Sequence, residues 1–358
     1  MVLLAGELAR RGLRVAFVVY PIPSQPPGID PRITLVERKE HAGPGPIQSL
    51  VEAARVLRAL RAANGRVVVV RSGTPVLGLI AVYCRLSRRR LVFSSANNLD
   101  FLDQWTRRAR TYAFGVRSAD AVVVQTREQE TLARHRFPEI RKLVCIPSFA
   151  AESRAIERHG PPTAFFWVGR LVDYKRPLLY SDLAAAIPDA RFVLIPLRIP
   201  LRPLHHAAEL EAYEQLELAA ARIPNLELRD SIPQAALVKE LASAVALVST
   251  SSHEGMPNTF LEAWSQGVPV LTLSFDPDGV VRERGLGVSA EGSWERFVAG
   301  ARELWDGRFE REELAQRTRD YVFEVHSIEG VGARWQALLE SFGGMEPRAA
   351  TSASPSSR

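Results

Sequence analysis

The stretch FWVGRLVDYKRP, residues 166–177, indicates the fold of the chain's second half. Its apolar run predicts a buried strand, Gly169 a tight turn, and the residues after it a loop. This order brings Arg170 and Lys175 to the carboxyl edge of the strand, where open parallel sheets bind ligands. Two cations at that edge suit a diphosphate, arginine as a planar fork and lysine as a point charge. A solvated basic loop is the alternative interpretation.

Outward from this stretch, short apolar runs alternate with amphipathic helical segments in both directions. Such continuous runs are typical of parallel strands covered on both faces. The pattern therefore predicts an α/β protein with two doubly wound, Rossmann-like domains. The expected strands are 15–20, 67–70, 91–93, 121–124, 143–146, 164–168, 192–195, 226–228, 245–248 and 268–273, and the clearest helices are 47–62, 107–118, 209–221 and 234–242.

The length of 358 residues suits two domains. We place an N-terminal domain at 1–150, a linker at 151–162, a C-terminal domain at 163–342 and a disordered Ser/Ala/Pro-rich tail at 343–358. The last helix, near 330–341, is expected to return to the first domain. The chain opens inside a helix, Leu3–Arg11, whereas a Rossmann-like half begins with a strand and a glycine-rich turn. We therefore expect the first domain to lack its first strand.

The segment ALVSTSSHEGMPNTFLEAW, residues 246–264, predicts a second strand, turn and helix. Gly255 permits close backbone approach, and Pro257 suits the first turn of a helix that stops at Gly267. The free amides near Asn258 and Thr259 then form an anion site, again suited to phosphate. The next segment, residues 267–280, is expected to supply another strand and the floor of the same site.

Two carboxylates frame this helix start. Glu254 is predicted in the turn and Glu262 about two turns into the helix, so they could hold separate hydroxyl-rich parts of one ligand, such as a hexose and a ribose. His253 beside Glu254 could be a metal ligand, but it has no partners in a metal-binding spacing and is interpreted as structural, as is the pair His205-His206. No metal site is predicted.

These ordered motifs resemble the C-terminal domain of the retaining, GT-B-fold glycosyltransferases called family four, or glycosyl transferases group 1. In that family a Gly-Arg-Leu turn is followed by a lysine, and a Glu-Gly-x-Pro segment leads to a second glutamate after seven residues. Glu254 and Glu262 match that spacing, and the resemblance runs from about residue 165 to 339. The first half resembles the family in its strand–helix rhythm.

The resemblance implies a role for each matching residue. Arg170 and Lys175 would neutralise the donor diphosphate, Glu254 would contact the transferred sugar, and Glu262 would bind the ribose hydroxyls. The turn and the amides that would hold sugar and phosphate belong to Gly169, Gly255, Met256, Pro257, Asn258 and Thr259. Cations placed there stabilise the negative charge that collects on a departing diphosphate, so no metal or other cofactor is expected.

The sequence departs from the family at two places. Residues 196–200 read PLRIP where the family tends to have a glycine-rich turn, and the histidine often found on the N-terminal domain's catalytic edge is missing from FSSANN, residues 93–98. Asn97 or Asn98 could contact donor or acceptor there, or could simply form a turn.

Charge and cysteine content limit the possible partners and cellular location of the protein. The net charge of +6 is the excess of 46 basic over 40 acidic residues. Only four of the basic residues are lysine, so we interpret the excess as an arginine bias and expect no nucleic-acid partner. Cys84 and Cys145 lack disulfide or metal spacing and are interpreted as buried thiols of a cytoplasmic protein. The basic and aromatic segment Trp105–Tyr112 could be a patch that reaches a membrane surface, or a solvated helix face.

The sequence thus predicts transfer of a sugar from a nucleotide-diphosphate sugar to a glycan, lipid-linked or small-molecule acceptor, with retention of configuration. One alternative is a nucleotide-sugar epimerase, but the first half shows no obvious acid–base pair for it. Another is a non-catalytic nucleotide-sugar-binding protein, which the absent first strand favours and the complete donor motif opposes.

Overall fold

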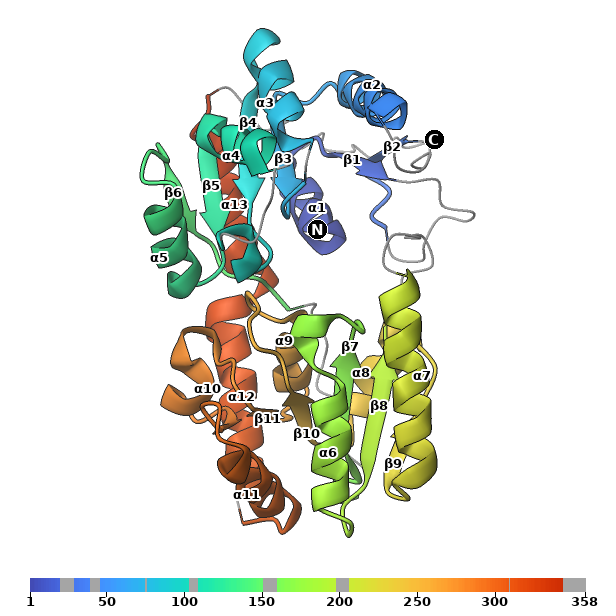
Figure 1. Ribbon diagram of the computed structural model, residues 1–358. Coiled ribbons are helices and arrows are strands. Elements are labelled where there is room, and N and C mark those ends of the chain that lie inside the picture. The colour runs from blue at the N-terminus through green and yellow to red at the C-terminus, as the bar shows by residue number, and fades with distance from the viewer. Residues whose placement is uncertain are drawn as a thin grey trace, which may run out of the picture.

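The computed structural model describes residues 1–19, 29–38, 46–74, 76–102, 109–150, 160–197, 206–308 and 310–343. The described chain forms two α/β parts, one above the other (Figure 1). The expected tail beyond Gly343, most of the expected linker, Trp105 and His205 lie outside the described residues.

The upper part is built from the first half of the chain. Its elements, in chain order, are α1 (Val2–Arg10), β1 (Ala16–Val19), β2 (Thr34–Glu37), α2 (Pro46–Ala63), β3 (Val67–Arg71), α3 (Leu77–Leu86), β4 (Arg90–Ser94), η1 (Asn98–Asp100), α4 (Ala109–Ser118), β5 (Ala121–Val124), α5 (Arg127–Arg136) and β6 (Leu143–Cys145).

The lower part is built from the second half. Its elements are β7 (Ala164–Gly169), η2 (Asp173–Lys175), α6 (Leu178–Ala186), β8 (Phe192–Pro196), α7 (His206–Arg222), β9 (Leu226–Leu228), α8 (Gln234–Ala242), β10 (Ala244–Ser249), α9 (Asn258–Ser265), β11 (Val270–Thr272), η4 (Pro277–Gly279), α10 (Val280–Glu283), β12 (Gly287–Ser289), α11 (Trp294–Trp305) and α12 (Arg311–His326), followed by α13 (Ile328–Glu340).

Two parallel sheets organise the upper part. A four-stranded sheet has the order β3-β4-β5-β6, and β1 pairs with β2 in a separate two-stranded sheet. The four-stranded sheet carries a core on each face: α3 and α4 cover one, while α1 and α13 cover the other. There Leu4 and Leu8 of α1 pack with Val331 and Trp335 of α13 against the sheet, so the last helix of the described chain packs on the upper part (Figure 1).

A single six-stranded parallel sheet organises the lower part, in the order β12-β11-β10-β7-β8-β9. All residues of β7, β8 and β10 are buried, as expected for strands covered on both faces. One core lies under α6, α7 and α11, the other under α8, α9 and α12. The doubly wound α/β fold predicted from the alternating runs is confirmed.

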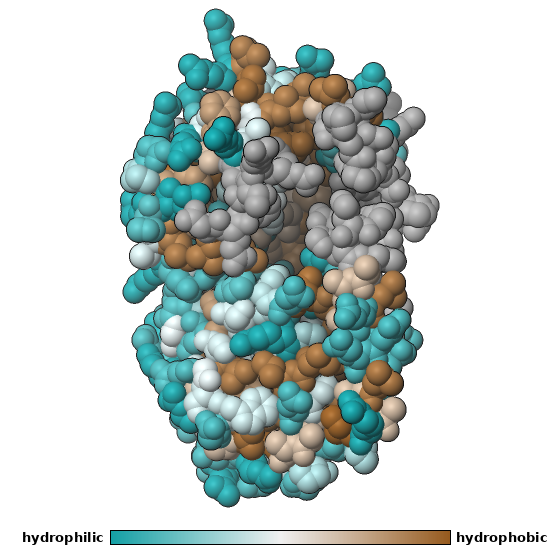
Figure 2. Space-filling model, viewed as in Figure 1, coloured by the Kyte–Doolittle hydropathy of each residue, from teal (hydrophilic) through white to brown (hydrophobic). Residues whose placement is uncertain are grey.

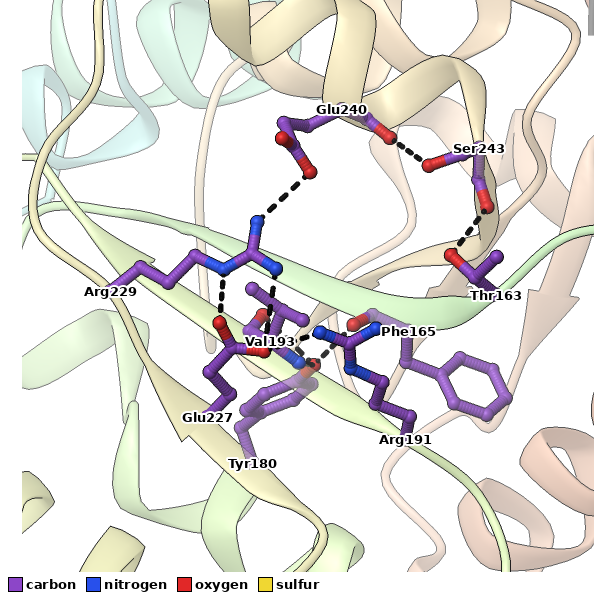
Figure 3. Close-up of polar contacts among 9 residues, drawn as sticks. All are labelled: Thr163, Phe165, Tyr180, Arg191, Val193, Glu227, Arg229, Glu240 and Ser243. Carbon is purple, nitrogen blue, oxygen red and sulfur yellow. Dashed lines mark hydrogen bonds and ion pairs between the residues drawn. The ribbon is translucent and has the colours of Figure 1, made fainter.

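Side chains brace the lower sheet away from its carboxyl edge (Figure 3). The hydroxyl of Tyr180 is fully buried and bonds the backbones of β7 and β8, donating to the Phe165 carbonyl at 2.9 Å and accepting from the Val193 N–H at 3.1 Å. On the edge strand, Arg229 bridges Glu227 and Glu240, which joins β9 to α8. The Tyr180 hydroxyl thus ties α6 to β7, the strand that leads into the Arg170 and Lys175 loop.

Candidate active site

The loop after β7 positions Lys175 through bonds to the neighbouring strand β10. Thr250 donates its hydroxyl to the Lys175 carbonyl at 2.6 Å and accepts from the indole of Trp167 at 3.0 Å. Arg176, in the left-handed conformation at φ 46°, donates to the Thr250 carbonyl at 2.7 Å. A Cβ on Gly169 would lie 3.1 Å from Lys175 Cδ, so glycine leaves room for the lysine stem. Lys175 is therefore held in place rather than free in an exposed loop.

Lys175 and Glu254 form an ion pair at the centre of the site. Lys175 Nζ lies 2.5 Å from Glu254 Oε1, and their side chains are 18% and 10% exposed. Ser251, also buried, donates to the same carboxylate oxygen at 3.2 Å. The alternative interpretation of a solvated basic loop does not fit Lys175, whose side chain is mostly buried and paired. Removing it would leave Glu254 partly buried without its counter-charge.

Arg170 is also paired with a carboxylate. Its Nη2 lies 2.9 Å from Glu209 Oε1 near the start of α7, while its buried Nε has no hydrogen-bond acceptor among the described residues. Sequence motifs did not identify Glu209, because it lies 39 positions along the chain from Arg170.

The start of α9 supplies amides to the same edge of the sheet. Pro257 is the N-cap, and its carbonyl accepts from the N–H of Phe260, so the amides of Asn258 and Thr259 precede the first hydrogen-bonded turn. A small pocket at this edge is lined by Trp167, Val168, Lys175, Leu247, Val248, Ser249, Ser251, Glu254, Pro257, Thr259 and Phe260. The structure thus brings Lys175, Glu254 and the helix start together around one pocket.

Glu262 lies apart from this pocket's lining. It is the fifth residue of α9, about one turn in rather than the expected two, and its carboxylate accepts from the Gln234 side chain at 2.8 Å. Burial raises the pKa of Glu262 above its usual range. A partly desolvated carboxylate of this kind gains from a hydroxyl donor.

The upper part meets the site through the turn after β4. Asn97 caps η1 by accepting from the Leu99 N–H, and its Nδ2 also lies 3.4 Å from Glu254 Oε2. Asn98 is buried, and its N–H lies 3.4 Å from the Glu254 carbonyl oxygen. Asn97 therefore both forms the turn and contacts a predicted site residue.

Gly255 lies in close contact with the upper part. A Cβ placed there would lie 2.6 Å from Gln129 Nε2 and 2.8 Å from both the Ala96 carbonyl oxygen and Gln125 Oε1. These three groups belong to the upper part. Only glycine fits this contact without displacement, which the motif alone could not predict.

The loop after β11 forms a second contact between the parts. Asp278, at φ 52°, accepts from the backbone N–H groups of Arg127 and Glu128 at 2.8 and 2.9 Å. These are the first amides of α5, so a carboxylate of the lower part caps a helix of the upper part. The segment expected to form the floor of the site, residues 267–280, contributes no lining residue to the small pocket, but its Asp278 joins the two parts.

His253 contacts protein groups. Its ring stacks on Tyr174 with centroids 5.1 Å apart, and Nδ1 lies 2.9 Å from the Ser252 hydroxyl. Burial lowers the pKa of His253. Among the described residues no cluster of three or more His, Cys, Asp or Glu side chains could hold a metal ion. No helix among these residues combines the length and the apolar character needed to cross a membrane.

Both halves of the chain match known families. The Glycosyl transferase 4-like domain matches residues 1–148, and Glycosyl transferases group 1 matches residues 162–306. The lipopolysaccharide core biosynthesis glycosyltransferase LpsE of Rhizobium meliloti (strain 1021) is 31% identical over 103 residues, which are 28% of this chain and 30% of that protein. The chain therefore matches less than a third of that relative's length.

Solved structures share the fold. Sucrose-phosphate synthase from Thermosynechococcus elongatus is similar at a TM-score of 0.73 and 16% identity, over 95% of this chain and 91% of that one. Anabaena HepE in complex with UDP-glucose is similar at a TM-score of 0.65 and 14% identity, over 87% of this chain and 86% of that one. At these identities the likeness establishes the two-domain architecture and leaves substrates to be argued from the site.

Proposed function

This chain belongs to the family-four, group 1 glycosyltransferases of the GT-B fold, and we propose that it transfers a sugar from a nucleotide-diphosphate sugar to a glycan, lipid-linked or small-molecule acceptor with retention of configuration. The observation that carries this proposal is the convergence of Lys175, Glu254 and the start of α9 on one pocket. HepE was solved with UDP-glucose, which supports a nucleotide sugar as the ligand class.

The donor diphosphate would bind between Lys175, Arg170 and the free amides of α9. In the structure both cations face carboxylates: Lys175 faces Glu254 and Arg170 faces Glu209. Phosphate oxygens are stronger partners for such cations, and they would also accept from the α9 amides. Positive groups held in advance at this position stabilise the charge that develops on the leaving diphosphate, so the proposal needs no resident metal.

Glu254 and Glu262 would bind the two hydroxyl-rich ends of the donor. Release of Glu254 from Lys175 frees a carboxylate at the pocket, where it would accept from sugar hydroxyls. Glu262 would bind the ribose in place of its present partner, Gln234. We propose that the acceptor hydroxyl attacks the anomeric carbon from the face of the leaving group and that its proton passes to the departing phosphate. The bond to the diphosphate then breaks as the new glycosidic bond forms, which retains the configuration.

A peripheral membrane location belongs to the same proposal. Hydrophobic residues are exposed near the top of the upper part in the view of Figure 2, over the region of α3 and α2. Val82 and Leu86 of α3 and Phe114 of α4 are 42%, 81% and 44% exposed. Exposed arginines such as Arg85 of α3 lie beside these hydrophobic side chains. Basic and hydrophobic side chains together suit binding to the surface of an anionic membrane.

The test is incubation with labelled nucleotide sugars, followed by analysis of all products. Transferred sugar supports the proposal. Epimerised donor would identify an epimerase, and donor that is bound but unchanged would identify a binding protein; either result would overturn it. A prior screen of nucleotide sugars for thermal stabilisation selects the donor.

The variant that tests the site is Lys175→Ala. We expect transfer to slow by about 100-fold or more, the scale for losing one charge-stabilising group. Lys239→Ala is the matched control, because Lys239 is exposed on α8. Circular dichroism must show that Lys175→Ala is folded, since it leaves Glu254 unpaired. Normal turnover in the folded variant would contradict the assigned role.

A further inference from the structure

Arg71 is a partly buried cation at the carboxyl end of β3 that the donor site does not use. It is the last residue of that strand, beside Ser94 of β4, and burial lowers the pKa of its guanidinium despite the nearby negative charge of Asp100. Arginine remains protonated in proteins, so a full positive charge is held here in a partly desolvated position.

The described partners of Arg71 are neutral. Its Nη1 lies 3.4 Å from the Ser94 hydroxyl. With the Gln125 amide oxygen turned toward it, Nη2 and Nη1 donate to that oxygen at 2.5 and 3.2 Å. No carboxylate among the described residues forms an ion pair with it. A partly desolvated charge that has only neutral partners costs stability, and such groups cluster at functional sites.

Asp100, the acidic group that acts on Arg71 electrostatically, is engaged elsewhere. Its Oδ1 accepts from the Gly73 N–H at 2.9 Å. Its Oδ2 accepts from the Ser95 hydroxyl and the Ala96 N–H, each at 2.9 Å. These bonds hold the carboxylate on the turn after β4, so it stabilises that turn rather than pairing with the guanidinium.

The location of Arg71 relates it to the transferred sugar. The Gln125 amide that contacts Arg71 also lies, at its other end, 3.4 Å from the backbone nitrogen of Met256. Met256 follows Glu254 and Gly255, the segment proposed to hold the sugar. One amide side chain thus separates the guanidinium from the donor segment.

Resting on the proposed function, we propose that Arg71 binds an anionic group, a phosphate or a carboxylate, on the acceptor substrate. The planar guanidinium offers two parallel N–H donors to either group. Binding would supply the missing counter-charge and would place an acceptor hydroxyl next to the donor sugar. The acceptor is then an acidic or phosphorylated glycan or a phosphate-linked lipid rather than a neutral sugar.

The test compares three probes of one size: glucose, glucose 6-phosphate and glucuronate. Each is titrated by calorimetry into protein saturated with the nucleoside diphosphate that stabilises it best, so that the donor's own phosphate site is filled. We expect at least one anionic probe to bind the natural protein about tenfold or more tightly than glucose, the scale of a hydrogen bond to a charged group. Preference for phosphate or for carboxylate identifies the acceptor's acidic group.

Arg71→Gln should abolish this preference and leave nucleotide binding unchanged. Arg71→Lys, which keeps the charge without the fork, should retain part of it and provides a second variant if the first does not fold. Arg85→Gln, at an exposed arginine of α3, is the control. Equal binding of all three probes by the natural protein, or an anion preference that survives in Arg71→Gln, would overturn the proposal. Failure of any nucleotide to bind would instead count against the proposed function.

Discussion

His326 lies at the junction between the two parts of the molecule, and we expect it to make the free energy of unfolding depend on pH. It is the last residue of α12 and is 1% exposed. Its Nδ1 lies 2.5 Å from the carbonyl oxygen of Ser148 in the upper part, its Nε2 lies 3.4 Å from the Tyr321 hydroxyl, and its own carbonyl accepts from the Ala150 N–H. The neutral ring with its proton on Nδ1 satisfies these contacts.

Burial lowers the pKa of His326 from 6.5 to about 4. Between these two values the unfolded chain binds a proton that the folded protein does not, so the free energy of unfolding falls as the pH falls through this window. The contribution of neutral His326 to the free energy of unfolding is fully present above the unfolded pKa and is about 3 kcal/mol in total. At pH 5 about 2 kcal/mol of this contribution is lost.

The measurement is urea unfolding at pH 7.5 and 5.0 of the natural protein and of His326→Gln. Glutamine does not titrate. The decrease in the free energy of unfolding from pH 7.5 to pH 5.0 should therefore be about 2 kcal/mol smaller in the variant. Other groups, such as Glu262, titrate equally in both proteins and cancel in this double difference. His135→Gln, on the exposed face of α5, should keep the natural pH dependence. An equal drop in the His326 variant would refute the reasoning.

Two further predictions concern the site. Gly255→Ala should destabilise the protein by about 1–3 kcal/mol and move the two parts apart, because the new methyl group meets Gln129, Gln125 and the Ala96 carbonyl. Thermal melting measures the stability and small-angle scattering the separation of the parts. Values equal to those of the natural protein would contradict this prediction. Glu262→Ala should weaken binding of the free nucleoside diphosphate. Glu254→Ala should preserve or strengthen this binding, because it releases Lys175. Calorimetry measures both affinities, and an equal loss of affinity in the two variants would reject this division of roles.

The sequence predicted those parts of the fold that local pattern determines. Apolar runs such as Phe192–Pro196 are buried on both faces and stand out from their flanking helices. The strands β2 and β12 were missed for physical reasons. Thr34–Glu37 is only half-buried, and Gly287–Ser289 has three residues and begins with a glycine at φ 148°. Short, partly exposed strands are stabilised by their neighbours, and periodicity does not reveal them.

The same distinction applies to the site. Lys175 and Glu254 were predicted for one site because each lies in a compact local motif at a strand's carboxyl edge, and the structure brings the two side chains together. Contacts between the halves were not predictable: the cap of α5 by Asp278 joins residues 150 or more positions apart. Thr126 signals where α5 starts, and its hydroxyl accepts from the Gln129 N–H, but nothing local indicates which carboxylate satisfies the remaining amides.

The ion pair between Lys175 and Glu254 would link donor binding to sugar recognition. Lys175 and Glu254 are desolvated together, so neither can leave the pair without a replacement partner. In the proposed site a diphosphate would provide one for Lys175, and a sugar hydroxyl would provide one for Glu254. A nucleoside diphosphate alone would satisfy only the first, whereas the complete donor would satisfy both. The same pair can therefore favour the intact nucleotide sugar over the product nucleotide, and loss of the sugar on transfer would restore the contact between Glu254 and Lys175 that promotes product release.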